Sequence, residues 1–199
     1  MFVVPRLFEV LRTRISKAIE KKGGMSAWLL DKALEIGAKQ SAGRLSLIDR
    51  PTKLLVDTLF KPKIAKRFGG RMKAMVSGGA PLNPEIGLFF HSIGLTLLQG
   101  YGQTEAAPVI ACNRPETGVR MDTVGPPLPE TEVQIAEDGE ILVRGKNVFA
   151  GYYKNPEATA ETVIDGWLHS GDLGSFDDEG YLSIIGRKKD IIITSGGKN

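Results

Sequence analysis

The hydrophobic pattern of the chain changes near residue 120, and this change limits the folds that the chain can adopt. Before it, apolar residues recur at helical spacing, as over 4–22, and such segments alternate with short apolar runs at 73–76 and 95–98. Alternating helices and strands are typical of an α/β sheet, which binds ligands at the carboxyl ends of its strands. The sequence therefore predicts an α/β fold, with part of a sheet subdomain over residues 1–120.

The second part of the chain is β-patterned. Segments 133–135 and 141–143 flank Asp138-Gly139, a pair typical of a hairpin turn, and three prolines precede them: Pro126, Pro127 and Pro129. The only helical pattern in this part covers 155–162. We expect a small β-barrel-like subdomain over 121–186.

Composition is that of a globular protein, since 42% of the 199 residues are hydrophobic and 25% are charged. The 26 basic residues outnumber the 23 acidic ones only slightly, but they gather near the amino end and over 53–73. A solvated helical face and a membrane-binding patch both fit this pattern. Because no basic run is interleaved with aromatic residues, we expect no nucleic-acid partner.

Cysteine content and hydropathy bear on the compartment. Cys112 is the single cysteine, so no disulfide can form within the chain, and a reducing compartment suits it. No apolar run approaches the length of about eighteen residues that a membrane helix needs, and we expect no signal peptide. The prediction is a cytoplasmic protein, with peripheral membrane contact through the amphipathic segment 4–22 left open.

The segment Gln99-Gly-Tyr-Gly-Gln-Thr-Glu105 follows an apolar run and suits a nucleotide phosphate with its magnesium. Gly100 and Gly102 permit a close approach that a side chain would block. An alternative is a tight turn whose tyrosine fills a gap in the core and whose glutamate faces water.

Three side chains of this segment carry the predicted chemistry. The ring of Tyr101 can lie on an adenine, and the hydroxyl of Thr104 can donate to a phosphate oxygen. Glu105 is a hard oxygen ligand, of the kind that Mg²⁺ accepts alongside substrate phosphates.

Six motifs in one order resemble those of the adenylate-forming (AMP-binding) superfamily, and most closely those of the long-chain fatty acyl-CoA synthetases. The resemblance covers nearly the whole chain. The motifs are Val4-Pro-Arg-Leu-Phe-Glu9, Ser77-Gly-Gly-Ala-Pro-Leu82, Tyr101-Gly-Gln-Thr-Glu105, Gly139-Glu-Ile-Leu-Val-Arg-Gly145 with Gly151-Tyr152, Trp167-Leu-His-Ser-Gly-Asp172 and Gly186-Arg-Lys-Lys-Asp190.

The resemblance implies a nucleotide site. Asp172 and Arg187 would hold the ribose hydroxyls, Thr104 would hold the α-phosphate region, and Glu105 would bind magnesium; the last two would be the catalytic residues. Gly79, Ala80 and Tyr101 would bracket the adenine, within a nucleotide-binding set that also includes Gly78, Pro81, Gln99, Gly100 and Gly102. Without the family pattern, the favoured interpretations are that Asp172 is a turn residue after Gly171 and that Arg187 forms a surface ion pair with Asp190.

The last residues, 187–199, would form the hinge that leads to a further carboxyl-terminal domain. Asp190 would be the pivot, and Gly196 and Gly197 would lie near the path of coenzyme A; a flexible turn is the alternative for these two glycines. His169 is assigned no role. The sequence gives no basis for predicting the oligomeric state.

The implied reaction uses ATP, Mg²⁺, a fatty acid and coenzyme A, forming first an acyl-adenylate and then a thioester. The chain lacks the Ser/Thr/Gly-rich phosphate loop of the family upstream of Gln99, and it stops at Asn199, before the domain that carries the adenylation lysine. We therefore expect an internal piece of a fatty acid–CoA ligase, inactive alone. The alternatives are an adenylate-forming enzyme for another acid and a noncatalytic nucleotide-binding domain.

Overall fold

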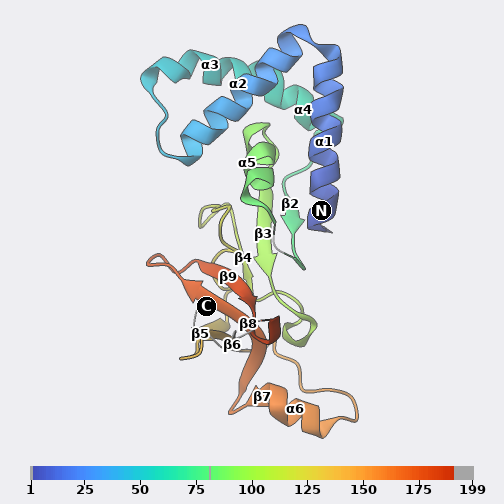
Figure 1. Ribbon diagram of the computed structural model, residues 1–199, viewed down its shortest axis with the longest axis vertical. Helices are drawn as coiled ribbons and strands as arrows, with labels where there is room; N and C mark the ends of the chain where they lie inside the picture. Colours follow the sequence, from blue (N-terminus) through green and yellow to red (C-terminus); the bar gives the residue numbers. More distant parts are fainter. Residues whose placement is uncertain (1, 81, 191–199) are drawn as a thin grey trace, which may run out of the picture. The chain divides into compact units, whose positions relative to one another are not determined.

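The computed structural model of the chain describes residues 2–80 and 82–190 (Figure 1). Contacts divide these residues into two compact units, which meet in the sequence between Leu98 and Gln99. The first unit is mainly helical and the second is mainly β. A mixed α/β class was predicted, and it is confirmed.

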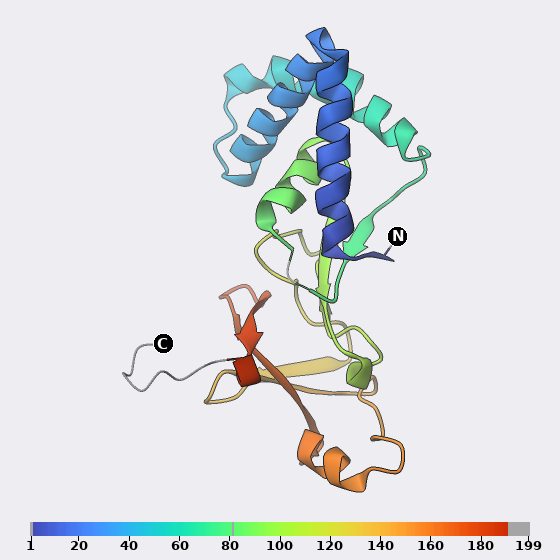
Figure 2. The same cartoon turned by 45° about the vertical axis from the view of Figure 1, so that its right-hand side comes forward.

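Helices dominate the first unit. Its long helices are α1 (Pro5–Lys22) and α2 (Gly24–Ser41), followed by η1 (Leu47–Asp49), α3 (Arg50–Leu55), the π-helical η2 (Val56–Phe60), α4 (Lys61–Arg67) and α5 (Pro84–Ser92). α5 begins where the sequence predicted, because the side chain of Asn83 accepts a hydrogen bond from Glu85 N at 2.8 Å. α1, α2 and α5 pack against one another (Figure 2).

Short strands lie beside these helices. β1 (Phe2–Val3) pairs in parallel with β2 (Met75–Ser77), and the nitrogen of Met75 donates to the oxygen of Thr96 at 2.9 Å. The core is built from aromatic and aliphatic side chains: Phe8 and Phe90 are fully buried and meet edge to face with their ring centres 5.4 Å apart. These contacts position the segment after β2, where one predicted nucleotide loop begins.

The apolar face of α1 is part of this core. Phe8 and Ile19 are buried, and Leu11 and Ile15 pack against the same cluster. These side chains of α1 pack within the protein, which is the alternative to membrane contact that the sequence left open. Within residues 2–80 and 82–190, no helix is both long enough and apolar enough to span a membrane.

Strand β3 (Leu97–Tyr101) leads into the second unit, where Gly100 and Tyr101 pair antiparallel with β4 (Ala111–Cys112). The rest of the unit is a five-stranded sheet in the order β5-β6-β8-β7, with β9 also on β8. Its elements are β5 (Thr131–Ile135), β6 (Glu140–Gly145), α6 (Pro156–Thr162), β7 (Val163–Ile164), β8 (Trp167–Phe176) and β9 (Leu182–Arg187). The predicted hairpin around Asp138-Gly139 joins β5 and β6, with Gly139 at a φ of 85°.

The division between the units falls earlier than residue 120, where the sequence predicted a boundary. Ile110 and Ala111 are fully buried in one cluster with Leu168 and Leu182. The chain near Gly125 also pairs with β9, since Val124 N donates to Leu182 O at 2.8 Å. Residues 99–120 therefore fold with the β-rich part that follows them.

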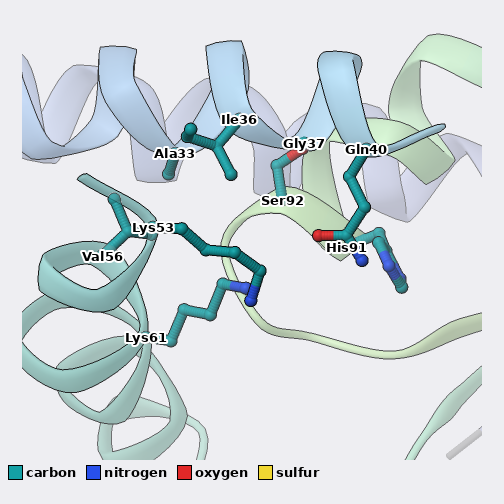
Figure 3. A pocket seen from close by; sticks show the side chains of 9 residues that line it. All are labelled: Ala33, Ile36, Gly37, Gln40, Lys53, Val56, Lys61, His91 and Ser92. Carbon is teal, nitrogen blue, oxygen red and sulfur yellow. The ribbon is translucent and has the colours of Figure 1, made fainter. Parts of the chain in front are cut away.

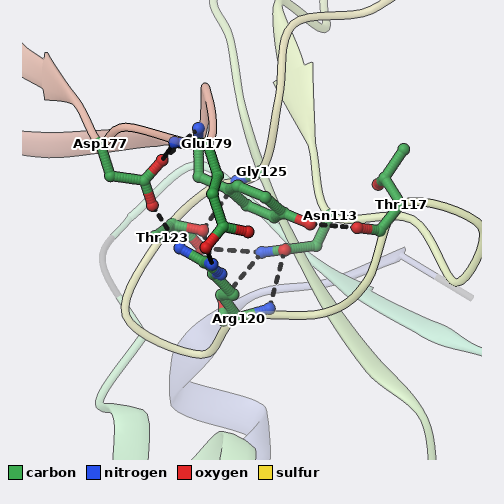
Figure 4. A network of polar contacts seen from close by, with 8 residues as sticks. Asn113, Thr117, Arg120, Thr123, Gly125, Asp177 and Glu179 are labelled. Atoms are coloured by element: carbon green, nitrogen blue, oxygen red, sulfur yellow. Dashed lines mark hydrogen bonds and ion pairs between the residues drawn. The ribbon is translucent and has the colours of Figure 1, made fainter.

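A buried asparagine organises the loop between β4 and β5 (Figure 4). Asn113 has no exposed surface; its side chain donates to Arg120 O at 3.0 Å and to Thr123 O at 2.8 Å, and it accepts from Arg120 N at 3.0 Å. The Arg120 guanidinium lies 4.4 Å from the ring centre of Tyr181 and bonds to Asp177. This network ties the loop to the turn between β8 and β9.

Candidate functional site

The end of β3 is shaped by glycines for reasons within the protein. A Cβ at Gly102 would overlap the backbone of Pro108, so only glycine lets the chain turn back on itself here. Gly100 pairs with Cys112 across the ladder, and its own Cβ would lie 3.3 Å from the oxygen of Ala111. Close approach of a ligand, on which the sequence prediction relied, is thus not what requires Gly102.

Asp172 lies between two predicted ligand-binding side chains, although they come from different parts of the sequence. Its Oδ2 accepts from the hydroxyl of Tyr101 at 2.7 Å, and its Oδ1 accepts from Nε of Arg187 at 3.0 Å. Asp172 and Arg187 face each other across β8 and β9. The structure therefore brings together three residues that the sequence placed around one nucleoside.

Exposure within this group differs sharply. The side chain of Asp172 is 9% exposed, whereas that of Arg187 is 66% exposed. Burial, followed by the hydrogen bond to Asp172, raises the pKa of Tyr101 above its ordinary value, so its hydroxyl stays a donor at neutral pH. The group offers a fixed carboxylate and a guanidinium that reaches into solvent, which suits a ligand with vicinal hydroxyls.

Glu105 has one anchored carboxylate oxygen. It lies in the short helix η3 (Thr104–Ala106), and its Oε1 accepts from the hydroxyl of Tyr152 at 2.8 Å. This hydrogen bond, and then burial, raises the pKa of Tyr152. Thr104, at the start of η3, is exposed.

The segment after β6 holds the backbone of η3 in place. The backbone nitrogen of Phe149 donates to the backbone oxygen of Glu105 at 2.8 Å. The rings of Phe149 and Tyr152 meet edge to face, with their centres 4.8 Å apart. Asn147 donates to the oxygen of Ala106 at 3.2 Å. The backbone of η3 is therefore held, while Thr104 at its start is exposed.

The donor set around Glu105 fits a magnesium ion that is bound mainly by a nucleotide. Among the described residues, no group of three metal-ligating side chains occurs. No described side chain bonds to Oε2 of Glu105, whereas Tyr152 bonds to its Oε1. Mg²⁺ keeps several waters and is commonly held by one or two carboxylates together with substrate phosphates. Glu105 meets that requirement, because Tyr152 anchors its Oε1 and its Oε2 is available to a metal ion.

The other predicted site residues are placed as follows. Gly78 is half-buried in the first unit, and Gly79, with a φ of 82°, and Ala80 are exposed there. Asp190 is exposed at the end of η4 (Lys188–Asp190). Pro81, Gly196 and Gly197 lie outside the described residues.

Gln99 is only 8% exposed, and both its side chain and its backbone bond to the loop that follows β4. Its side-chain nitrogen donates to the oxygen of Met121, and its backbone oxygen accepts from Asn113 N at 2.8 Å. In this structure the side chain of Gln99 supports the loop after β4.

Sequence reasoning missed the roles of Tyr152 and Glu140. Both stand in the motif that begins at Gly139, but neither was given a chemical task. In the sequence, Glu140 only opens a β-patterned segment and Tyr152 only follows Gly151. Their partners, Glu105 and Gly171, are distant in sequence, so no local pattern could name them.

The first unit contains a small cavity of about 70 Å³ between α2, η2 and α5 (Figure 3). Lys53 and Lys61 line it, and the carboxylate of Asp57 forms an ion pair with each, at 2.5 and 2.7 Å. Burial, and then the charge of Lys61, lowers the pKa of His91 at its edge. The cavity holds none of the predicted site residues.

Comparison with known protein families gives a match over most of the chain. The model of the AMP-binding enzyme family matches residues 1–153. The chain belongs to the AMP-binding enzyme family. The resemblance predicted from the six motifs is thereby confirmed.

Curated relatives of this AMP-binding chain include CoA ligases. Long-chain-fatty-acid–CoA ligase FadD15 of Mycobacterium tuberculosis is 41% identical over 198 residues, which are 98% of this chain and 33% of that ligase. Long chain acyl-CoA synthetase 1 of Arabidopsis thaliana is 34% identical over 214 residues, which are 98% of this chain and 31% of that synthetase. The chain spans about a third of the length of the curated relatives it matches.

Solved structures of the same family share the fold. O-succinylbenzoate coenzyme A synthetase from Bacillus subtilis, in complex with ATP and magnesium ion, has a TM-score of 0.58 and 34% identity, covering 64% of this chain and 29% of that one. ATP-bound MatB from Rhodopseudomonas palustris has a TM-score of 0.61 and 33% identity, covering 72% of this chain and 30% of that one.

Proposed function

We propose that this chain supplies part of the ATP site of a long-chain fatty acid–CoA ligase. The observation that carries the proposal is the carboxylate of Asp172, held between the Tyr101 hydroxyl and the Arg187 guanidinium. Membership of the AMP-binding family and the names of the relatives support it. The activity is that of the complete protein, of which this chain would provide the residues described below.

Asp172 and Arg187 bind the ribose in this proposal. The buried carboxylate accepts hydrogen bonds from the ribose hydroxyls, and the exposed guanidinium donates to them. The hydroxyl of Tyr101 holds the carboxylate, which leaves the ring of Tyr101 to lie against the adenine. Because these groups are fixed before the nucleotide binds, little ordering is needed on binding.

Thr104 and Glu105 act at the phosphates. The exposed hydroxyl of Thr104 donates to the α-phosphate region, and the oxygen of Glu105 that Tyr152 leaves unbonded binds magnesium. When bound, the metal stabilises the charge that develops on the phosphate oxygens. The contribution of the chain is to hold these donors in position, which is the main requirement in phosphate displacement.

The proposed reaction has two steps. A carboxylate oxygen of the fatty acid attacks the α-phosphorus of ATP, and the bond to pyrophosphate breaks, which leaves an acyl-adenylate. The sulfur of coenzyme A then attacks the acyl carbon, and AMP leaves as the thiol proton is lost to solvent. Asp190 is the proposed hinge between the two steps.

For the acid substrate, one relative supports an alternative to a fatty acid. Feruloyl-CoA synthase of an Amycolatopsis species is 41% identical to this chain over 139 residues, which are 64% of this chain. An aromatic acid is therefore the second candidate substrate.

A competition assay separates the two acids. The complete protein is given ATP, Mg²⁺ and coenzyme A with equal amounts of palmitate and ferulate, and the thioesters are quantified. We expect palmitoyl-CoA to dominate. Dominance of feruloyl-CoA would replace the fatty acid by an aromatic acid, and the absence of both thioesters would contradict the ligase proposal.

A further inference from the structure

Glu140 is a buried carboxylate to which the reaction above assigns no task. It is the first residue of β6 and only 5% exposed. Its Oε1 accepts from Gly171 N at 2.9 Å, and its Oε2 lies 2.9 Å from Nζ of Lys188 and 3.1 Å from Nδ1 of His169. His169 and Gly171 belong to β8, and Lys188 begins η4 directly after β9.

Two of these partners stand directly beside the proposed ribose ligands. Gly171 precedes Asp172 in β8, and Lys188 follows Arg187 at the end of β9. Asp172 and Arg187 are themselves paired across the two strands. Glu140 therefore bonds to the chain immediately before one ribose ligand and immediately after the other.

The local backbone makes this position sensitive. Gly171 has a φ of 71° inside a strand, and the ladder between β8 and β9 shifts register between Leu173 and Gly174. Neither feature is part of a regular ladder, so the direction of the Asp172 side chain depends on a local restraint. The hydrogen bond from Gly171 N to Glu140 is one such restraint on the backbone, beside the bond from Asp172 N to Oγ of Ser170 at 3.1 Å.

Charge balance keeps Glu140 ionised. Burial alone would raise its pKa, but hydrogen bonds from Lys188, His169 and the nitrogen of Gly171 outweigh burial and lower the pKa. Lys188 also pairs with Asp138 at 2.6 Å. The carboxylate can therefore hold both strands at neutral pH.

We propose that Glu140 is a positioning residue for ribose binding, which aligns Asp172 through Gly171 and Arg187 through Lys188. The inference rests on the proposed function, because it takes Asp172 and Arg187 as the ribose ligands. It adds that β6 sets their geometry without contacting the nucleotide. Lys188 lies two residues before Asp190, so the same ion pair fixes the chain immediately ahead of the proposed hinge.

The test compares two nucleotides that differ only in the ribose hydroxyls. Dissociation constants of AMP and 2′,3′-dideoxyAMP are measured by calorimetry for the chain and for Glu140→Gln, which keeps the shape of the side chain and removes its charge. We expect Glu140→Gln to weaken AMP binding about 10-fold, the effect of losing one charge-assisted hydrogen bond, and to leave dideoxyAMP binding unchanged.

Two further variants probe the same mechanism. Lys188→Met removes the ion pair and should reduce the preference for AMP in the same way, whereas Lys188→Arg keeps a cation and should restore most of the preference. The matched control is Glu132→Gln, which breaks the exposed pair with Arg144 on the neighbouring strands. This control should leave the binding of both nucleotides unchanged.

The outcomes separate the two proposals. If Glu140→Gln weakens the binding of both nucleotides equally, the role of Glu140 is merely structural, and if it weakens neither, Glu140 has no role. Either result overturns the positioning proposal. The ribose assignment still stands in both cases if Asp172→Asn abolishes the preference for AMP. If the unaltered chain binds AMP no better than dideoxyAMP, the ribose assignment itself fails and this inference falls with it.

Discussion

At the scale of single residues, Gly102 shows how a correct motif can be explained by the wrong contact. The motif predicted that glycines make room for a nucleotide. In the structure, the backbone of Pro108 occupies the space that a side chain at Gly102 would need. The restriction is internal to the loop, and it applies whether or not a ligand is bound.

Gly102→Ala should therefore destabilise the second unit. Forcing a methyl group against a backbone carbonyl shifts the loop, and we expect the free energy of unfolding to fall by about 2 kcal/mol or more. Urea denaturation measures this change. Gly186→Ala is the matched control, because no heavy atom lies within 4 Å of a Cβ there, and it should change stability by less than about 1 kcal/mol. Equal effects of the two substitutions would refute the packing explanation.

Tyr152 should tune the metal affinity of Glu105. Tyr152→Phe removes only the hydroxyl that bonds to Oε1, which frees the carboxylate to rotate. We expect the Mg²⁺ concentration needed for half-maximal ATP binding to rise about 10-fold, as when other groups that orient a metal ligand are removed. The neighbouring Tyr153 is 88% exposed, and Tyr153→Phe should leave the Mg²⁺ titration unchanged. A shift of the same size in both variants would count against the role of Tyr152.

The sequence named the members of the site but not their pairing. Tyr101, Asp172 and Arg187 were each predicted from a motif, yet the bond from Tyr101 to Asp172 joins residues 71 positions apart. Arg187 had a local alternative partner in Asp190, and the structure pairs it with Asp172 instead. Local pattern cannot choose between such partners, because the choice is made by the register of β8 and β9.

At the scale of elements, local signals predicted what local interactions decide. The helix after Asn83 and the hairpin around Asp138-Gly139 form where their capping and turn residues indicated. The length of β8 was not predicted, since its ten residues include Gly171 and Gly174 and are defined by three neighbouring strands. Strand pairing over long sequence separations is a tertiary effect, which single-sequence patterns do not encode.

The loop between β4 and β5 should depend on Asn113. Asn113→Ala removes three hydrogen bonds from a side chain with no exposed surface, and it leaves backbone groups of half-buried Arg120 and buried Thr123 without this partner. We expect a loss of about 2–4 kcal/mol in the free energy of unfolding of the second unit.

Asn83→Ala in the first unit is the comparison for this substitution. It removes a single exposed cap bond to Glu85 and should cost about 1 kcal/mol. Chemical denaturation followed by circular dichroism measures both variants. A smaller loss for Asn113→Ala than for Asn83→Ala would contradict the organising role of Asn113.

At the scale of the whole molecule, acid should destabilise the chain partly through Glu140. Its pKa is lowered on folding, so its stabilising effect is complete above the unfolded value of 4.5 and is lost as the pH falls through the lower folded value. Glu140→Gln should therefore narrow the difference between the urea midpoints at neutral pH and at a pH below 4.5. An unchanged difference would show that this carboxylate does not contribute to acid lability.

The division into units was the least predictable large-scale feature. The change of pattern near residue 120 marks where β-structure becomes continuous, but the compact unit already begins at Gln99. Ile110, Ala111 and the network of Asn113 pack with residues more than fifty positions later, so the unit is larger than its β-patterned sequence.

The central claim is that Asp172 binds the nucleotide of an enzyme that activates a fatty acid as its adenylate. Isotope exchange between pyrophosphate and ATP, measured on the complete protein, tests it most directly, because exchange requires reversible formation of the adenylate. We predict exchange that requires both fatty acid and Mg²⁺ and that falls at least about 10-fold in Asp172→Ala, the loss expected for charge-assisted hydrogen bonds. Exchange that needs no added acid, or that is unaffected by Asp172→Ala, would contradict the claim.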